Sequence, residues 1–280
     1  MIAILLTILC SSSIALILKD NHIRNGNPLL LLAGNYFIAA VISFILVLSD
    51  KKASFSTETV IFGIVLASLF VMTFFAFAKA VGTAGTALAT VSSRLSVVVP
   101  LILSIMIYQE KPSGFQIAGI FLTFLTILLF YFSIRNQSAQ NLKFPDYFYL
   151  LAVMLGIGIN DFSMKVFEQW RPGVEKLYFI FIIFSAATIF TFSIIFIKKI
   201  PLEKIVLLRG GILGLPNMFS TFFILLALAQ IPAIVVYPIT NIGIILLTAL
   251  GAALFWRERL NIYGKWALSA GIISILFLSL

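Results

Sequence analysis

The chain alternates long apolar runs with short polar gaps along its whole length. A helix needs about 20 mostly apolar residues to cross about 30 Å of hydrocarbon, and the runs approach or exceed that length. The gaps hold the charges and the helix-breaking residues, and several are so short that consecutive helices must be antiparallel neighbours. The pattern predicts ten membrane-spanning helices, at residues 2–18, 28–48, 59–78, 83–107, 114–134, 147–167, 174–197, 209–229, 233–255 and 261–280.

The composition indicates that the solvent of this protein is a lipid bilayer. Hydrophobic residues make up 61% of the 280 positions, charged residues make up 10%, and phenylalanine occurs 28 times. No soluble fold hides that much apolar surface. The formal net charge is +9, but the bases sit in the gaps, where they flank membrane spans. We therefore expect contact with lipid and no nucleic-acid partner.

Residues that build metal sites and common catalytic sets are nearly missing from the chain. Cys10 is the single cysteine and His22 the single histidine. One cysteine excludes an intramolecular disulfide and a cysteine-based zinc cluster. We expect neither enzymatic activity nor a metal or cofactor. The N-terminal run has no basic region before it and no small-residue cleavage pattern, so it is predicted to remain as the first span.

The pattern of residues 79–119 recurs at residues 227–267, with an offset of 148 and no gap. Ser92 falls on Thr240 and Glu110 on Glu258, and polar or charged matches of this kind are less frequent by chance than apolar ones. We interpret this as an internal duplication. It predicts a first five-helix repeat at 1–135, a connecting loop at 136–146 and a second repeat at 147–280.

The odd number of spans in each repeat fixes how the two copies relate. Five spans force the second copy to enter the membrane from the opposite side. The predicted fold is therefore an all-α integral membrane protein, with ten transmembrane helices arranged as two inverted five-helix repeats. Many secondary transporters have this architecture, and their substrate site lies near the midplane between the repeats.

Two motifs make the chain similar to a known family. Each repeat closes its fourth span with a glutamate and a base, Glu110-Lys111 and Glu258-Arg259. The sixth span carries Gly158-Ile159-Asn160-Asp161-Phe162-Ser163-Met164-Lys165, which is similar to the Trp-Gly-x-Asn-Phe-x-x-x-Lys segment that opens each repeat of that family. With its ten spans, the chain resembles the drug/metabolite transporter superfamily, EamA-like branch.

That resemblance implies a multi-pass transporter of the cell's inner or plasma membrane, working on small solutes. It covers the whole chain but does not choose among amino acids, sugars, nucleotides, cations and drugs. Two features depart from the pattern. The first repeat keeps only Ser12-Ser13 and Lys19 of its opening segment, and Arg94 inside the fourth span is not a general feature of the family.

Charged residues at membrane depth are the strongest functional signal, because each costs about 3 kcal/mol at the bilayer centre. Arg94 lies near the middle of the fourth span and needs an anionic partner or a wet cavity. Asp161 is the one acid well inside a span, and Lys165 follows one helical turn later. Each has a structural alternative: Arg94 paired permanently with Asp161, Asp161 paired locally with Lys165, and Lys79 reaching to the interface from a span end.

Neutral polar residues and prolines complete the predicted site. Pro100 and Pro238 are expected to kink the fourth and ninth spans, and Gly85/Ala89 and Gly210/Gly214 to permit close helix packing. The predicted substrate-binding residues are Arg94, Ser92, Ser93, Asn160, Asp161, Lys165, Tyr237, Asn241, Tyr36 and Lys79.

Deep bases outnumber the deep acid, which favours a substrate that carries a carboxylate. We expect a metabolite exporter, with amino acids as the first choice, that works by alternating access as a monomer or weak dimer. Proton coupling is one option for the driving force. A same-class alternative is an exporter of organic cations that uses Asp161 and the aromatic residues. A different-class alternative is a membrane scaffold that transports nothing.

Two arguments disagree on which side the termini face. Lysines and arginines in the gaps number six on the side of the N-terminus and eleven on the other side. By the positive-inside rule this places both termini outside the cell. The family resemblance implies that both termini are cytoplasmic.

Overall fold

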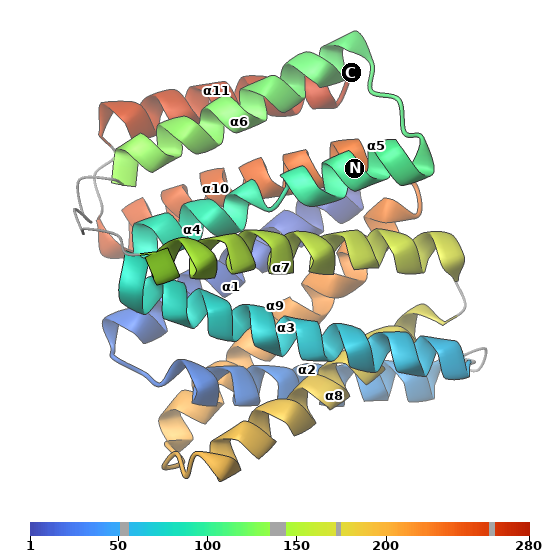
Figure 1. Ribbon diagram of the computed structural model, residues 1–280, viewed down its shortest axis with the longest axis vertical. Coiled ribbons are helices and arrows are strands. Elements are labelled where there is room, and N and C mark those ends of the chain that lie inside the picture. The colour runs from blue at the N-terminus through green and yellow to red at the C-terminus, as the bar shows by residue number, and fades with distance from the viewer. Residues whose placement is uncertain (51–55, 135–143, 172–174, 258–260) are drawn as a thin grey trace. The chain divides into compact units, whose positions relative to one another are not determined.

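The computed structural model describes residues 1–50, 56–134, 144–171, 175–257 and 261–280. Within these ranges the secondary structure is helical, without strands (Figure 1). The helices are α1 Ile2–Ile23, α2 Pro28–Ser49, α3 Thr57–Ala84, α4 Thr86–Leu95, α5 Val98–Tyr108, α6 Gly114–Ile134, α7 Phe144–Trp170, α8 Lys176–Ile197, α9 Lys204–Leu228, α10 Ala233–Trp256 and α11 Ile262–Leu278.

The helical content confirms the predicted fold class. In the described ranges, nine stretches are long and apolar enough to cross a membrane, and α11 is a shorter apolar helix. The predicted spans agree with the helices to within a few residues, except that the fourth is divided into α4 and α5. Most of the predicted connecting loop 136–146 lies outside the described residues, as does Glu258.

The chain forms two compact units, which are described separately. Unit 1 contains Met1–Val71 and Val166–Ala229, and unit 2 contains Met72–Lys165 and Gln230–Leu280. The boundaries fall inside α3 and α7, so each of these helices contributes to both units. Each unit also draws helices from both predicted repeats. The division of the sequence into repeats therefore remains a prediction about ancestry and topology, distinct from these two units.

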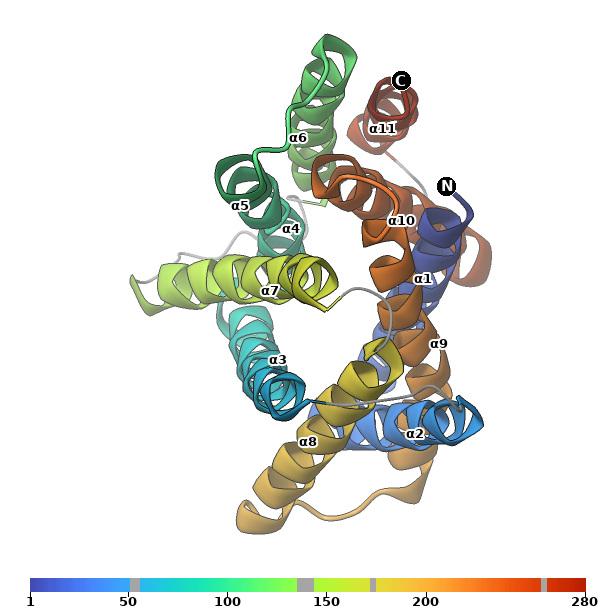
Figure 2. The same ribbon diagram turned by 90° about the vertical axis from the view of Figure 1, so that its right-hand side faces the viewer.

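In unit 1, α2 packs against α8 and α9, and α1 packs against α9 (Figure 2). Glycines allow the backbones of α2 and α9 to touch. A Cβ atom on Gly210 would lie 2.0 Å from the carbonyl oxygen of Leu31, and one on Gly214 would lie 2.5 Å from that of Asn35. This confirms the close packing predicted for Gly210 and Gly214. The contact is polar as well, because Asn217 Nδ2 donates to Asn35 Oδ1 at 3.1 Å.

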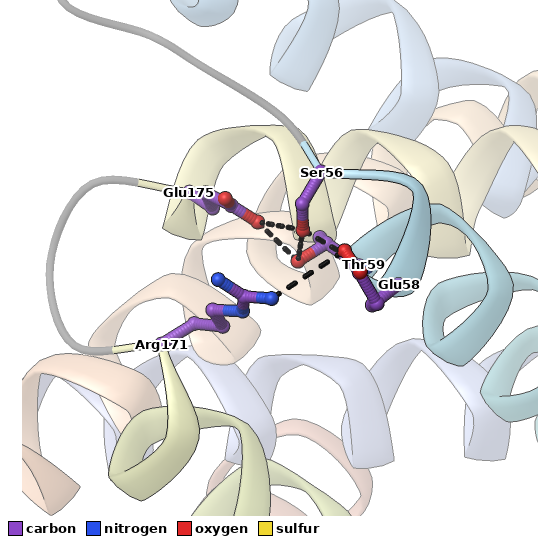
Figure 3. Close-up of polar contacts among 5 residues, drawn as sticks. All are labelled: Ser56, Glu58, Thr59, Arg171 and Glu175. Atoms are coloured by element: carbon purple, nitrogen blue, oxygen red, sulfur yellow. Dashed lines mark hydrogen bonds and ion pairs between the residues drawn. The ribbon is translucent and has the colours of Figure 1, made fainter.

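Polar side chains also join three helix ends in unit 1. Glu175 precedes α8, and its carboxylate accepts hydrogen bonds from Ser56 Oγ, at 2.9 Å, and from Thr59 Oγ1 at the start of α3. Arg171, after the end of α7, lies 3.4 Å from a carboxylate oxygen of Glu58. Figure 3 shows Glu175 and Arg171 directed at the start of α3, where Glu58 and Thr59 lie. These contacts tie the start of α3 to the segment that joins α7 to α8.

In unit 2, α6 and α11 lie side by side (Figure 1), and α10 packs against α5, α6 and α11. The Oγ atoms of Thr123 and Ser274 are 3.1 Å apart, and a Cβ on Gly271 would lie 3.4 Å from Thr126 Cγ2. Ser274 is the position that matches Thr126 at the offset of 148, and Gly271 is the position that matches Thr123. If the two copies are exchanged, Thr123 maps onto Gly271 and Ser274 onto Thr126. The Thr123–Ser274 contact therefore maps onto the Gly271–Thr126 contact.

The division of the fourth span into α4 and α5 corrects the prediction of a single kinked helix. Pro100 has no N–H for the carbonyl of Ser96, and its ring crowds that carbonyl. The break lies at Ser96 and Val97, and Val99 N–H donates to the Ser96 carbonyl at 3.0 Å instead. Pro238 breaks nothing, because the carbonyl it would leave free belongs to the first turn of α10. Gly85 corrects a second expectation: it has a φ of 87° and precedes α4 rather than packing inside a helix.

Candidate functional site

The structure brings nine of the ten predicted site residues into unit 2. They are Lys79 on α3, Ser92, Ser93 and Arg94 on α4, Asn160, Asp161 and Lys165 on α7, and Tyr237 and Asn241 on α10. Tyr36 lies on α2 in unit 1, where it is buried with its ring centroid 6.2 Å from that of Phe184. The nine residues come from both predicted repeats, as a site between repeats requires.

Arg94 lies in the last turn of α4, and its charge interacts with that of Asp161 on α7. Its Nε is buried and has no hydrogen-bond partner within the described part of the chain. The neighbouring serines do not serve it, since Ser93 Oγ donates to Thr90 O and Ser96 Oγ to Ser93 O, both at 2.7 Å. Arginine keeps its charge at physiological pH. The site thus holds a fixed positive charge with an unused N–H donor.

Asn160 adds an unused acceptor next to Asp161. Its Nδ2 donates to Thr73 Oγ1 on α3 at 3.4 Å, whereas its buried Oδ1 has no partner among the described residues. Glycines let α7 approach its neighbours here. A Cβ on Gly156 would lie 2.4 Å from Thr73 Oγ1, and one on Gly158 would lie 2.8 Å from the carbonyl oxygen of Ser96. The Gly-x-Asn-Asp segment therefore sits against α3 and against the break between α4 and α5.

Tyr237 connects α10 to this part of α7. Its buried hydroxyl donates to the backbone carbonyl of Asp161. The phenol also interacts electrostatically with the carboxylates of Asp161 and Glu110. Tyr237 thus lies close to two acids, one inside α7 and one beyond the end of α5.

Lys165 is paired with Glu110, the residue that follows the C-cap of α5. Lys165 Nζ lies 2.8 Å from Glu110 Oε1, and the exposed fractions of the two side chains are 5% and 10%. The same carboxylate accepts the N–H groups of Ala233 and Ile234, at 3.1 and 3.0 Å, and so caps the start of α10. Lys165 Nζ also lies 5.5 Å from the centroid of the Tyr108 ring.

Comparison with known proteins gives a family match in the first part of the chain. The model of the EamA-like transporter family matches residues 1–132. An uncharacterized protein of Haemophilus influenzae is 29% identical over 272 residues, which cover 92% of this chain and 90% of that protein. Residues 1–132 are EamA-like. This confirms the resemblance to the drug/metabolite transporter superfamily, and it indicates a multi-pass membrane transporter of that type.

A solved crystal structure supports the fold of the whole chain. It is described as "Crystal structure of protein" and superposes with a TM-score of 0.79 at 13% sequence identity. The superposition covers 99% of this chain and 94% of that chain. At that identity the likeness shows the fold and nothing of the substrate.

Two of the remaining predicted residues make contacts between or within helices, and the third is exposed. Ser92 Oγ donates to the backbone carbonyl of Leu150 on α7, and Asn241 Nδ2 donates to Tyr237 O in its own helix at 3.2 Å. Lys79 is exposed, as expected of a lysine that reaches to the interface. A role for these three residues in substrate binding remains a prediction.

Glu110 is the residue that sequence reasoning placed least well. A glutamate at a span end, next to Lys111, is expected to be solvated or to pair with that lysine, and a local pair with Asp161 was the structural alternative for Lys165. The structure instead buries Glu110 against Lys165 and α10. One signal for this was available: a glutamate that recurs at the offset of 148 is poorly explained as a solvated loop residue.

Proposed function

We propose that the protein is a secondary transporter that exports small polar metabolites bearing a carboxylate, amino acids foremost. It works by alternating access in the inner or plasma membrane. Arg94, Asp161, Asn160 and Tyr237 form the centre of the substrate site, on helices from both repeats. Proton exchange at Asp161 provides the coupling.

The buried Nε of Arg94 carries this proposal. A guanidinium donor without a partner in a low-dielectric environment costs about 1–3 kcal/mol, and a substrate carboxylate supplies two oxygen acceptors in the geometry that arginine binds. Within unit 2 the charge opposite Arg94 is Asp161. A substrate carboxylate that displaces Asp161 therefore gains hydrogen bonds that the resting pair leaves unmade.

The unused Oδ1 of Asn160 favours a zwitterion over a simple anion. An ammonium group has three donors and no acceptor. The unused Oδ1 of Asn160 would accept from it. An α-amino acid presents a carboxylate and an ammonium a few ångströms apart, which matches a site that has an arginine donor and an asparagine acceptor.

Counterflow in proteoliposomes tests the proposal. Labelled amino acids, a sugar phosphate and a quaternary ammonium compound would each be tested with and without a pH gradient, for the wild type and for Arg94→Gln, Arg94→Lys and Asp161→Asn. We expect amino-acid exchange, an affinity about 10- to 100-fold weaker in Arg94→Gln from the loss of a charged hydrogen bond, and partial retention in Arg94→Lys, which keeps the charge but loses the fork.

Other outcomes favour the other functions. Exchange of the quaternary ammonium compound alone, lost in Asp161→Asn and retained in Arg94→Gln, would establish the cation exporter instead. Wild-type amino-acid affinity in Arg94→Gln would overturn the role of Arg94. A purified protein that no solute of the panel stabilises against heat, and that exchanges none of them, would favour the scaffold.

A further inference from the structure

Two buried ion interactions lie one helical turn apart on α7. Asp161 interacts with Arg94 of α4, and Lys165 is paired with Glu110 at the end of α5. Residues at i and i+4 share a helix face, so Asp161 and Lys165 are near neighbours that have opposite charges and different partners. A change in the partner of either residue must therefore affect the other.

The Glu110 carboxylate holds more than Lys165. It also binds two backbone N–H groups at the start of α10, so the single residue joins the end of α5, the C-terminal part of α7 and the start of α10. If Lys165 leaves, Glu110 still caps α10, but the connection from α10 to α7 through this carboxylate is gone.

We propose that Lys165 exchanges partners between Glu110 and Asp161, and that this exchange couples loading of the substrate site to release of α10 from α7. This inference rests on the proposed function and names Lys165 and Glu110 as its positioning residues. In the empty state Arg94 neutralises Asp161, and Lys165 is held by Glu110. When a substrate carboxylate takes Arg94, Asp161 becomes a buried acid without its base, and Lys165 is the cation within one turn of it.

The energetic argument favours exchange over two static pairs. Leaving one member of a buried pair alone costs about 3–5 kcal/mol, so binding of an anion to Arg94 is unfavourable unless Asp161 finds another cation. Loss of Lys165 costs less at Glu110, because its carboxylate still accepts two N–H groups and still lies at the positive end of the α10 dipole. Tyr237 interacts electrostatically with both carboxylates between which Lys165 would exchange.

The test uses the purified protein without substrate. Arg94→Gln imitates the removal of Arg94 from Asp161, and double-mutant cycles in thermal unfolding measure which acid Lys165 is coupled to. One cycle combines Lys165→Gln with Glu110→Gln, and the other combines Lys165→Gln with Asp161→Asn. Each cycle is measured in the wild-type background and in the Arg94→Gln background. Glutamine at position 110 can still accept a hydrogen bond from α10, so this change removes the charge and spares the cap.

With Arg94 present, we expect Lys165 to be coupled to Glu110 by about 3 °C in Tm and to Asp161 by almost nothing. In the Arg94→Gln background the coupling to Glu110 should shrink and the coupling to Asp161 should appear. A merely structural pair predicts the same Lys165–Glu110 coupling in both backgrounds, and that result would overturn the proposal.

Spin labels give a second measurement in case some cycle members unfold. Cys10 is the single cysteine, so Cys10→Ala gives a cysteine-free chain, and Leu155→Cys and Gln230→Cys add exposed labels on α7 and just before α10. A longer distance population is expected in Arg94→Gln and in Glu110→Gln, but not in Arg94→Lys. An unchanged distance in both neutral variants would contradict the exchange. Neither measurement uses transport, so failed counterflow leaves this result standing and failed exchange leaves carboxylate transport standing.

Discussion

At the scale of single residues, this protein pairs buried acids with lysines. Glu110 binds a lysine and two backbone N–H groups, and Glu168 lies 3.0 Å from Lys176 with both side chains less than 10% exposed. A charge inside a membrane protein is expensive unless paired. Arg94 differs from Glu110 because its Nε has no hydrogen-bond partner among the described residues. Because of that difference we propose Arg94, and not Glu110, as the binding group.

The sequence predicted one charge interaction of the site and missed the other, for a physical reason. Arg94 and Asp161 could be matched because each is the sole strong charge of its sign near mid-depth of its span. For Lys165, the acid four residues earlier was the obvious partner. Its true partner follows α5, and the contact depends on where that helix ends relative to α7, which no local pattern encodes.

Glu175 makes stability depend on pH in the acid range. Burial raises its pKa, but the hydrogen bonds from Thr59 and Ser56 and the charge of Arg171 outweigh burial, so the pKa lies below the ordinary value of 4.5. A lowered folded-state pKa gives stabilisation that is complete above pH 4.5 and is lost as the pH falls through the folded-state value. We predict that Tm in detergent falls below pH 4.5 and that Glu175→Gln reduces the fall.

A matched control for Glu175 exists in the same unit. Asp20 pairs with Arg24 at 2.9 Å, but both side chains are well exposed, and such pairs contribute little. Asp20→Asn should therefore leave the pH profile of the wild type unchanged. An equal flattening by both substitutions would show that general surface charge, rather than the Glu175 contacts, sets the acid sensitivity.

At the scale of helices, prolines and glycines explain where the structure follows the sequence pattern and where it departs. The apolar runs were enough to place each span within a few residues. The division between α4 and α5 was harder to predict, because a proline frees the carbonyl four residues earlier and the visible break therefore lies at Ser96 rather than at Pro100. Pro238 has the same chemistry without a break, since its effect falls on a helix end.

The glycine contact between α2 and α9 gives a prediction at this scale. Gly210→Ala would place a methyl group 2.0 Å from the Leu31 carbonyl oxygen, so the two backbones must separate. We expect a loss of about 3 kcal/mol, the upper part of the range for overpacked sites. Tm in detergent, measured by fluorescence-detected size exclusion, should drop clearly.

Gly82→Ala on α3 is the control for that prediction. A Cβ there would meet nothing within 4 Å, and alanine is the better helix former by about 1 kcal/mol. The variant should match or exceed the wild type. Equal losses for Gly82→Ala and Gly210→Ala would mean that the close approach of α2 and α9 is not what the glycine at position 210 protects.

At the scale of the whole chain, local geometry repeats at the offset that the sequence shows. Gln109 and Arg257 are 148 positions apart, and both end their helices in the left-handed conformation, with φ of 54° and 53°. Their capping N–H bonds reach Ser104 and Ala252, which are related by the same offset. Together with the reciprocal contacts of α6 and α11, this supports an internal duplication. It also makes helix α11 the counterpart of α6, which is long enough to span.

The orientation in the membrane is the prediction that belongs to this scale. The structure changes which lysines and arginines count as loop charges. Lys165 and Lys176 were among the six bases on the side of the N-terminus, but both are buried in ion pairs and so do not act as loop charges. The other side keeps its eleven. We therefore predict, on the positive-inside rule, that both termini lie outside the cytoplasm, against the implication of the family resemblance.

Reporter fusions after Lys111, Lys199 and Leu280 test the orientation in a bacterial host. Alkaline phosphatase is active only outside the cytoplasm, and green fluorescent protein fluoresces only within it. Ten spans place Lys111 and Leu280 on one side and Lys199 on the other. We therefore expect phosphatase activity at Lys111 and Leu280 and fluorescence at Lys199. The reverse pattern would support the family orientation. If Leu280 reported the same side as Lys199, the short helix α11 would not cross the membrane, and the chain would have nine spans instead of ten.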